Sequence, residues 1–477
     1  MNCTLMGSIL VGITLSSILL FKLQVGLILA FSLFLVPLCL HSYAIGQYSL
    51  LNGPQPASVN KIVRSHATQT EWFAHIAFGY WLIASGIKVF LIFILFGHNP
   101  LLGTFISSCI TLAFAYLVFS LTVLDRSTPI ARTFQPLAPK ALVLFLLWSG
   151  LTLFWTRPAS IISSLGYWAT MTLDILVVFL LCGTDDLRKV MHKSLQGIVL
   201  GGLSIFLVAS FFQIETIHSR LGDAEFLNPN IIGRQIALSA LCCLYLSSLS
   251  IQSPHSKVGW TFLTGLLALA LLQTLSKSSI LAFLVAAIAF IFLGRFRRQE
   301  QFLIGFSFII VTTLSYDKIV DYTNQYVHET QAGEALETLS GRTMIWEHAW
   351  KLIQTNPIWG FGFYSFRDYS PITLMGRLVH AHNEWLNIWF NVGIIGVILA
   401  ATLYLSFFTL TWTTRSRTAL QDETALALSL ILFYVILGLT EANPRGLNFP
   451  LPLLMLFIRY FSEAIYPCDP QKNFYAP

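Results

Sequence analysis

Residues 340–366 read SGRTMIWEHAWKLIQTNPIWGFGFYSF, and residues 379–396 read VHAHNEWLNIWFNVGIIG. Most of the chain around them is apolar enough to lie in lipid, and 340–397 is the longest stretch that is not. A loop rich in ionisable groups between apolar segments is where we expect chemistry on a polar substrate. Those groups are Arg342, Glu347, Arg367, Asp368, Arg377, His380, His382 and Glu384.

The composition predicts an all-α, polytopic membrane protein. Of 477 residues, 55% are hydrophobic and only 10% are charged, whereas soluble domains carry about 25% charged residues. The net charge of +6 indicates positive cytoplasmic loops and gives no reason to expect a nucleic-acid partner. The seven cysteines include no Cys-x-x-Cys pair, so they are interpreted as packing thiols, with no disulfide framework or metal site.

A spanning helix needs about 20 mostly apolar residues. On this basis the sequence predicts about fourteen transmembrane helices, and the first is expected to be retained because it lacks a small-residue cleavage site. The predicted spans are 5–21, 23–40, 72–96, 101–124, 140–156, 161–182, 195–213, 229–251, 258–275, 278–294, 302–315, 386–410, 425–441 and 449–466.

Basic residues in short loops predict the orientation. Arg295, Arg297 and Arg298 should be cytoplasmic. Counting outward from them places both termini and the loop that contains Arg188 inside. Four parts follow: an N-terminal bundle at 1–215, helices with an Asn-Pro-Asn segment at 216–315, a periplasmic loop at 316–385, and C-terminal helices at 386–477.

The long loop contains a predicted amphipathic helix at 343–354, with Ser340 as its N-cap. Its tryptophans are typical of a helix on the membrane surface. Gly360 and Gly362 then predict a turn. The aromatic residues at 361–366 either stack on sugar rings or form the hydrophobic core of the loop.

His382 is the candidate general base, because histidine titrates near neutral pH. It precedes a membrane helix on the predicted outer face, and His380 is a weaker candidate beside it. A structural histidine is the alternative in each case.

Arginines on the same predicted face are candidates for binding a diphosphate, since a guanidinium group can form two parallel hydrogen bonds to phosphate oxygens. The alternative is surface charge paired with carboxylates, or, for Lys277, an interfacial anchor. These residues are Arg220, Arg234, Arg342, Arg367, Arg377 and Arg445, with Lys277 as a further candidate for substrate contact.

Three segments together resemble the O-antigen ligase and polymerase family of membrane glycosyltransferases. They are RLGDAEFLNPNIIG at 220–233, SGR…W…NPIWGFGF at 340–363, and HNEWLNIWFNVGIIG at 382–396. The similar region runs from about 215 to 400. The sequence departs from the family pattern at Ser276-Lys277, where Ser-Arg is usual, and in having more than about twelve spans.

The resemblance implies transfer of a glycan from an undecaprenyl-diphosphate donor on the periplasmic face of the bacterial inner membrane, without a metal or other cofactor. Arg220 and Arg342 then correspond to the family's diphosphate-binding loop arginines, and His382 to its catalytic histidine. The implied partners are the lipid-linked donor, a glycan or lipid A-core acceptor, the lipid bilayer, and a chain-length regulator and flippase of the same pathway.

Two questions stay open at the level of sequence. A polymerase, slightly favoured by the long loop, would extend another lipid-linked repeat, whereas a ligase would use lipid A-core. The alternative from another class is a transporter for a small anion such as bicarbonate. A transporter should place charge on broken helices at the bilayer midplane, and the ionisable residues instead gather at one predicted face.

Overall fold

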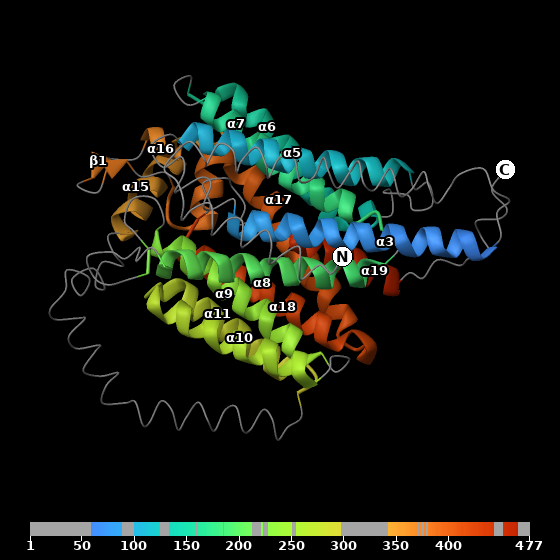
Figure 1. Ribbon diagram of the computed structural model, residues 1–477. Coiled ribbons are helices and arrows are strands. Elements are labelled where there is room, and N and C mark those ends of the chain that lie inside the picture. The colour runs from blue at the N-terminus through green and yellow to red at the C-terminus, as the bar shows by residue number, and fades with distance from the viewer. Residues whose placement is uncertain are drawn as a thin grey trace, which may run out of the picture.

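Long apolar runs form helices that pack side by side (Figure 1). The computed structural model describes residues 59–87, 100–124, 133–157, 161–184, 186–211, 221–222, 228–249, 254–296, 342–369, 372–373, 376–377, 380–442 and 452–465. The membrane-type helices are α3 (Val59–Leu82), α5 (Pro100–Leu124), α6 (Leu137–Leu151), α7 (Ile161–Leu181), α8 (Leu187–Phe211), α9 (Pro229–Ser248), α10 (Pro254–Gln273), α11 (Lys277–Leu293), α17 (Glu384–Thr414), α18 (Gln421–Thr440) and α19 (Leu453–Ile465).

Seven helices among the described residues are long and apolar enough to cross a membrane, and each overlaps a predicted span. Shorter apolar helices lie at Phe105–Leu121 and Lys277–Leu293, where two more spans were predicted. The spans predicted at 5–21, 23–40 and 302–315 lie outside the described residues. The all-helical membrane class is therefore confirmed, while the count of fourteen stays a prediction.

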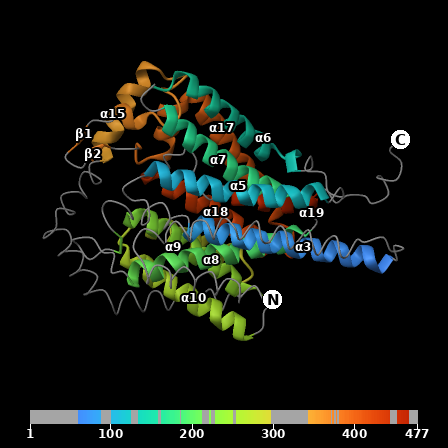
Figure 2. The same ribbon diagram turned by 45° about the horizontal axis from the view of Figure 1, so that its top comes forward.

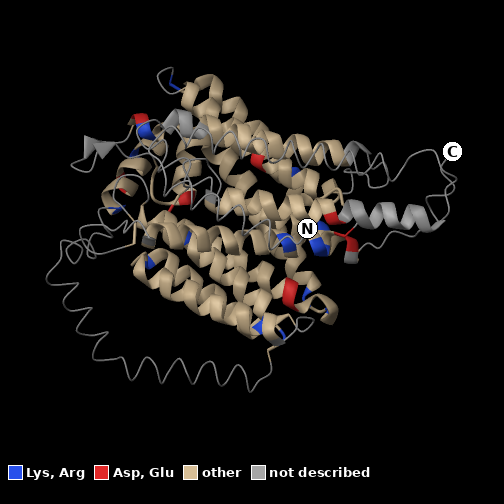
Figure 3. Ribbon diagram, in the orientation of Figure 1, with Lys and Arg blue, Asp and Glu red and all other residues tan. Residues whose placement is uncertain are grey.

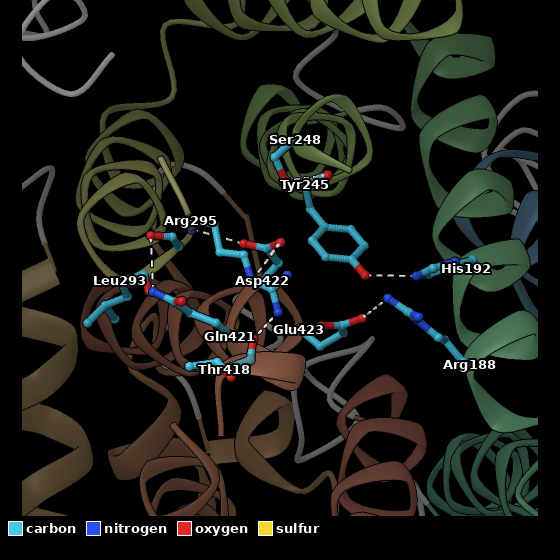
Figure 4. A network of polar contacts seen from close by, with 11 residues as sticks. Arg188, His192, Tyr245, Ser248, Leu293, Arg295, Thr418, Gln421, Asp422 and Glu423 are labelled. Carbon is cyan, nitrogen blue, oxygen red and sulfur yellow. Dashed lines mark hydrogen bonds and ion pairs between the residues drawn. The ribbon is translucent and has the colours of Figure 1, made fainter. Parts of the chain in front are cut away.

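Charged residues gather mainly toward the two ends of these helices (Figure 3). At one end Arg188 on α8 pairs with the buried Glu423 on α18 at 2.8 Å. Arg295, which follows α11, donates its backbone N–H to Asp422 at 2.9 Å. Figure 4 shows how these contacts link α8, α11 and α18. Arg188 and Arg295, both predicted to be cytoplasmic, thus meet at one end of the bundle. The side of the membrane that this end faces stays a prediction.

One carboxyl group lies between these ends. Asp174 on α7 is 3% exposed and accepts hydrogen bonds from Tyr80 of α3 at 3.0 Å and Thr111 of α5 at 3.2 Å. Buried polar groups in apolar surroundings need such partners. The contacts join three helices of the N-terminal part.

Helix α17 is interrupted at Gly393, where φ is 69° and ψ is −176°. The backbone groups released by the break are satisfied by the loop that follows α15 (Arg342–Thr355). Phe361 N–H donates to Phe390 O at 2.9 Å, and Ile394 N–H donates to Pro357 O at 2.9 Å. Non-helical backbone is tolerated at membrane depth only where protein satisfies it, so this loop is an integral part of α17.

Helix α15, the short α16 (Phe366–Tyr369), and the hairpin of β1 (Ile372–Thr373) and β2 (Gly376–Arg377) lie at the same end as the start of α17 (Figures 1 and 2). The amphipathic helix predicted at 343–354 is confirmed, although Ser340 lies outside the described residues. Its buried Ala349 and Ile353 pack in one cluster with Phe390 of α17. The apolar side of α15 is therefore covered by the protein.

Candidate functional site

The candidate site lies where four segments distant in sequence meet. Helix α15 contributes Arg342, the segment before α17 contributes His380 and His382, and Glu441 follows α18. Helix α9 contributes Asn230, whose side chain donates to Glu441 Oε1 at 3.0 Å. All four segments were predicted to be at the outer face.

The start of α9 is fixed by its own sequence. Asn228 is the N-cap, and its side chain accepts the backbone N–H of Asn230 at 2.8 Å, with Pro229 in the first helical turn. Asparagine and proline suit these two positions. The cap explains Asn-Pro-Asn structurally, and it also places the Asn230 side chain against Glu441.

Glu441 is the centre of the cluster and is 8% exposed. Arg342 Nη2 lies 2.5 Å from Glu441 Oε1, and His382 Nδ1 lies 3.6 Å from Oε2. The first distance is that of a strong charge-assisted hydrogen bond, while the second exceeds hydrogen-bond length. The carboxylate is therefore held chiefly by Arg342 and Asn230.

The two histidines are held by backbone geometry. His382 has φ of 52°, a left-handed conformation that is uncommon outside glycine. Its N–H donates to His380 Nδ1 at 3.2 Å, and the two rings meet edge to face with centroids 4.3 Å apart. Ala381 N–H reaches Asn387 Oδ1 at 3.4 Å, so the first turn of α17 holds the residue between them.

Electrostatics keep His380 neutral and Glu441 ionised. Burial, the neighbouring His382 and the guanidinium groups of Arg234 and Arg342 lower the pKa of His380 to about 3, against the opposing effect of Glu441. Burial alone would raise the pKa of Glu441, but its contacts with His382 and Arg342 outweigh burial and lower it. The cluster therefore presents a carboxylate, a neutral imidazole and two cations.

The imidazole and carboxylate atoms of His380, His382 and Glu441 lie within 4.8 Å of one another. Two observations argue against a divalent cation as their ligand. Arg342 already binds Glu441, and Arg234 also acts on the cluster. His380 Nδ1 accepts the His382 N–H and is therefore occupied. Fixed positive charge beside a carboxylate suits an incoming anion better than a metal.

Comparison with known proteins identifies part of this region. The family model for O-antigen ligase matches residues 262–401. We call residues 262–401 the O-antigen ligase domain, after the family model that they match. The match supports assignment of the chain to the O-antigen ligase and polymerase family, as the resemblance implied. Among curated proteins nothing matches the chain.

The O-antigen ligase domain includes Arg342, His380 and His382, whereas Asn230, Arg234 and Glu441 lie outside the matched range. The cluster is thus completed by helices that flank the domain in sequence. Sequence reasoning noted Asn230 only as part of the Asn-Pro-Asn segment, and it did not single out Glu441. A carboxylate directly after an apolar run on the face of the candidate arginines was the available signal for Glu441.

The other predicted residues divide into two groups. Lys277 begins α11 and is exposed, while Arg367 lies over the Tyr364 ring at 4.3 Å and 3.9 Å from Asp368. These two contacts of Arg367 hold the loop of the O-antigen ligase domain together. Arg220, Arg445 and the side chain of Arg377 lie outside the described residues.

The aromatic run at 361–366 forms a hydrophobic core. Phe363, Tyr364 and Phe366 are at most 5% exposed, and Phe361 stacks on Phe390 with centroids 4.7 Å apart. Of the two interpretations left open by the sequence, core packing is the one that the structure supports. Sugar stacking by these buried rings was the other, and their burial leaves no face for it.

Proposed function

We propose that this protein transfers a glycan from a polyprenyl-diphosphate donor to a hydroxyl acceptor. The observation that carries the proposal is the convergence of His382, Arg342 and Arg234 at one end of the bundle, with two of the three inside the O-antigen ligase domain. The family implies lipid-linked glycan and acceptor substrates in a membrane.

In the proposed reaction the acceptor oxygen attacks the anomeric carbon from the face opposite the diphosphate. The new carbon–oxygen bond forms as the bond to the diphosphate oxygen breaks, and the electron pair leaves with the diphosphate. Arg342 and Arg234 stabilise that charge, with Arg220 as a further candidate from the sequence. The acceptor proton passes to His382, and the anomeric configuration inverts.

His382 Nε2 is the atom assigned to this proton transfer. His382 Nδ1 faces the Glu441 carboxylate at 3.6 Å, and an imidazole whose one nitrogen faces a carboxylate presents the other to substrate. His380 is a poor alternative base, because its lowered pKa makes its neutral form a weak proton acceptor.

Among acceptors we propose a second lipid-linked repeat, which makes the protein a polysaccharide polymerase of the bacterial inner membrane with both termini cytoplasmic. Lipid A-core, the acceptor of a ligase, is the other outcome of the test. Purified protein supplied with lipid-linked donor alone should produce a ladder of extended glycans, and this transfer should persist in a metal chelator. A product formed only after lipid A-core is added would identify a ligase.

The decisive variant is His382→Ala, which should bind donor and transfer about 10²–10⁴-fold more slowly. A matched control is His348→Ala, because His348 lies on α15 and hydrogen-bonds to the Tyr369 carbonyl oxygen at 2.8 Å, outside the cluster around Glu441. Normal transfer by His382→Ala, or loss caused only by failure to bind donor, would overturn the assignment of the base.

A further inference from the structure

Glu441 makes two unequal contacts in the candidate site. One carboxylate oxygen binds Arg342 at 2.5 Å and Asn230 at 3.0 Å. The other faces His382 Nδ1 at 3.6 Å. A shift of a few tenths of an ångström would therefore turn the second contact into a hydrogen bond.

His382 Nδ1 is free to form such a hydrogen bond. It is buried and makes no hydrogen bond with any residue that the structure describes. A buried polar atom without a partner is costly, so a small movement that supplies one is favourable. The Glu441 oxygen at 3.6 Å is positioned to do this.

Binding of a diphosphate would cause Glu441 to move. It carries at least two negative charges and binds guanidinium forks through paired hydrogen bonds. In the absence of donor, the charge of Arg342 is balanced by Glu441. Donor and Glu441 must then compete for Arg342, and a doubly charged anion is the stronger competitor.

We propose that Glu441 is a positioning residue that changes partner with the donor. It holds Arg342 while the site is empty, and it binds His382 Nδ1 once the diphosphate has taken Arg342. The inference rests on the proposed function and adds a coupling to it, because His382 becomes an effective base only when donor is present.

The charged groups around His382 come from every segment of the cluster. Arg234 on α9 and Arg342 on α15 act on the adjacent His380, whose pKa they help to lower, and Glu441 after α18 opposes them. His380, on the same segment as His382, stays neutral because of its lowered pKa. Glu441 is the carboxylate that faces His382 Nδ1, at 3.6 Å.

The test is the pH dependence of transfer, measured with an undecaprenyl-diphosphate-linked donor. Glu441→Gln removes the carboxylate charge and keeps an amide of similar size. We expect kcat to fall about tenfold, since the base itself remains. The acid limb of the pH–rate profile should move about one unit lower, and the donor KM should not rise, because Arg342 is released. An unmoved acid limb, or a large rise in KM, would overturn the inference.

A second variant keeps the inference testable if Glu441→Gln does not fold. Asn230→Ala removes one of the two hydrogen bonds to Glu441 Oε1, so the donor should displace the carboxylate more easily and KM should fall. An unchanged KM would contradict the partner change. Transfer at a normal rate by His382→Ala would instead refute the proposed function, so the two failures are distinguishable.

Discussion

Gly393→Ala tests whether the loop after α15 and the break in α17 form one unit. A Cβ at Gly393 would lie 2.0 Å from Ile358 O and 2.8 Å from Trp359 C, at a φ of 69°. The backbone conformation alone costs about 1–3 kcal/mol outside glycine. Displacing the loop also loosens three backbone hydrogen bonds, from Phe361, Gly362 and Ile394, each contributing about 0.5–1.5 kcal/mol. The total destabilisation is about 2.5–7.5 kcal/mol.

The assay is thermal unfolding of the purified protein in detergent, together with glycan transfer. Gly265→Ala is the matched control, because a Cβ at Gly265 on α10 meets nothing within 4 Å. Alanine there should be neutral or stabilising by up to about 1 kcal/mol. We expect Gly393→Ala to lower Tm by several degrees and to reduce transfer, with both unchanged in the control. Equal Tm and activity in the two variants would refute the coupling of loop and helix.

Three further predictions concern the site and the topology. Arg342→Lys keeps the positive charge but loses the planar guanidinium group that binds phosphate through two hydrogen bonds, so transfer should fall steeply. Arg415→Lys, at the opposite end of the bundle, should transfer normally. Equal transfer rates in the two variants would mean that Arg342 only anchors the helix. His380 has its pKa lowered to about 3, so unfolded chains bind more protons and stability should fall as pH drops from about 6.5. His380→Asn should reduce that loss, and an identical pH profile of Tm would contradict the electrostatic account. Cysteines replacing Ala335 and Arg297 in a Cys-free background should label from opposite sides of the membrane, and labelling from one side would refute the predicted orientation.

Apolar runs and basic loops made much of the helical bundle predictable. A run of about 20 apolar residues is stable in lipid only as a helix, so the spans near 140–156 and 229–251 were identifiable without knowledge of packing. Basic residues in every second loop likewise predicted that Arg188 and Arg295 lie at the same end of the bundle. It also placed Arg342 and His382 together at the other end.

The break in α17 could not be predicted in the same way. Gly393 lies in an apolar run, where a glycine is ordinarily a tolerated helix residue. The break is stable because Pro357 and Phe361, more than 30 residues earlier, satisfy the released backbone groups. Such a pairing depends on tertiary contact, and no local pattern records it. Glu441 was missed for a related reason, since its partners come from three other segments.

In the polar motif HNEWLNIWFN, the asparagines support the backbone, whereas the histidine is the candidate for the chemistry. Asn383 caps α17 and donates to the Leu439 carbonyl oxygen at 3.0 Å. Asn387 accepts from Ala381, and Asn391 accepts the Ser365 N–H at 2.9 Å. These side chains satisfy backbone groups that lipid could not. Asn383 directly follows His382, which has the left-handed conformation, and Asn387 binds the residue before it. A conformation of that kind persists only where its surroundings over-determine it. Asn383 and Asn387 therefore serve the site by fixing the backbone from which His382 projects, and the chemistry is left to the histidine and to the charged groups that reach it from other helices.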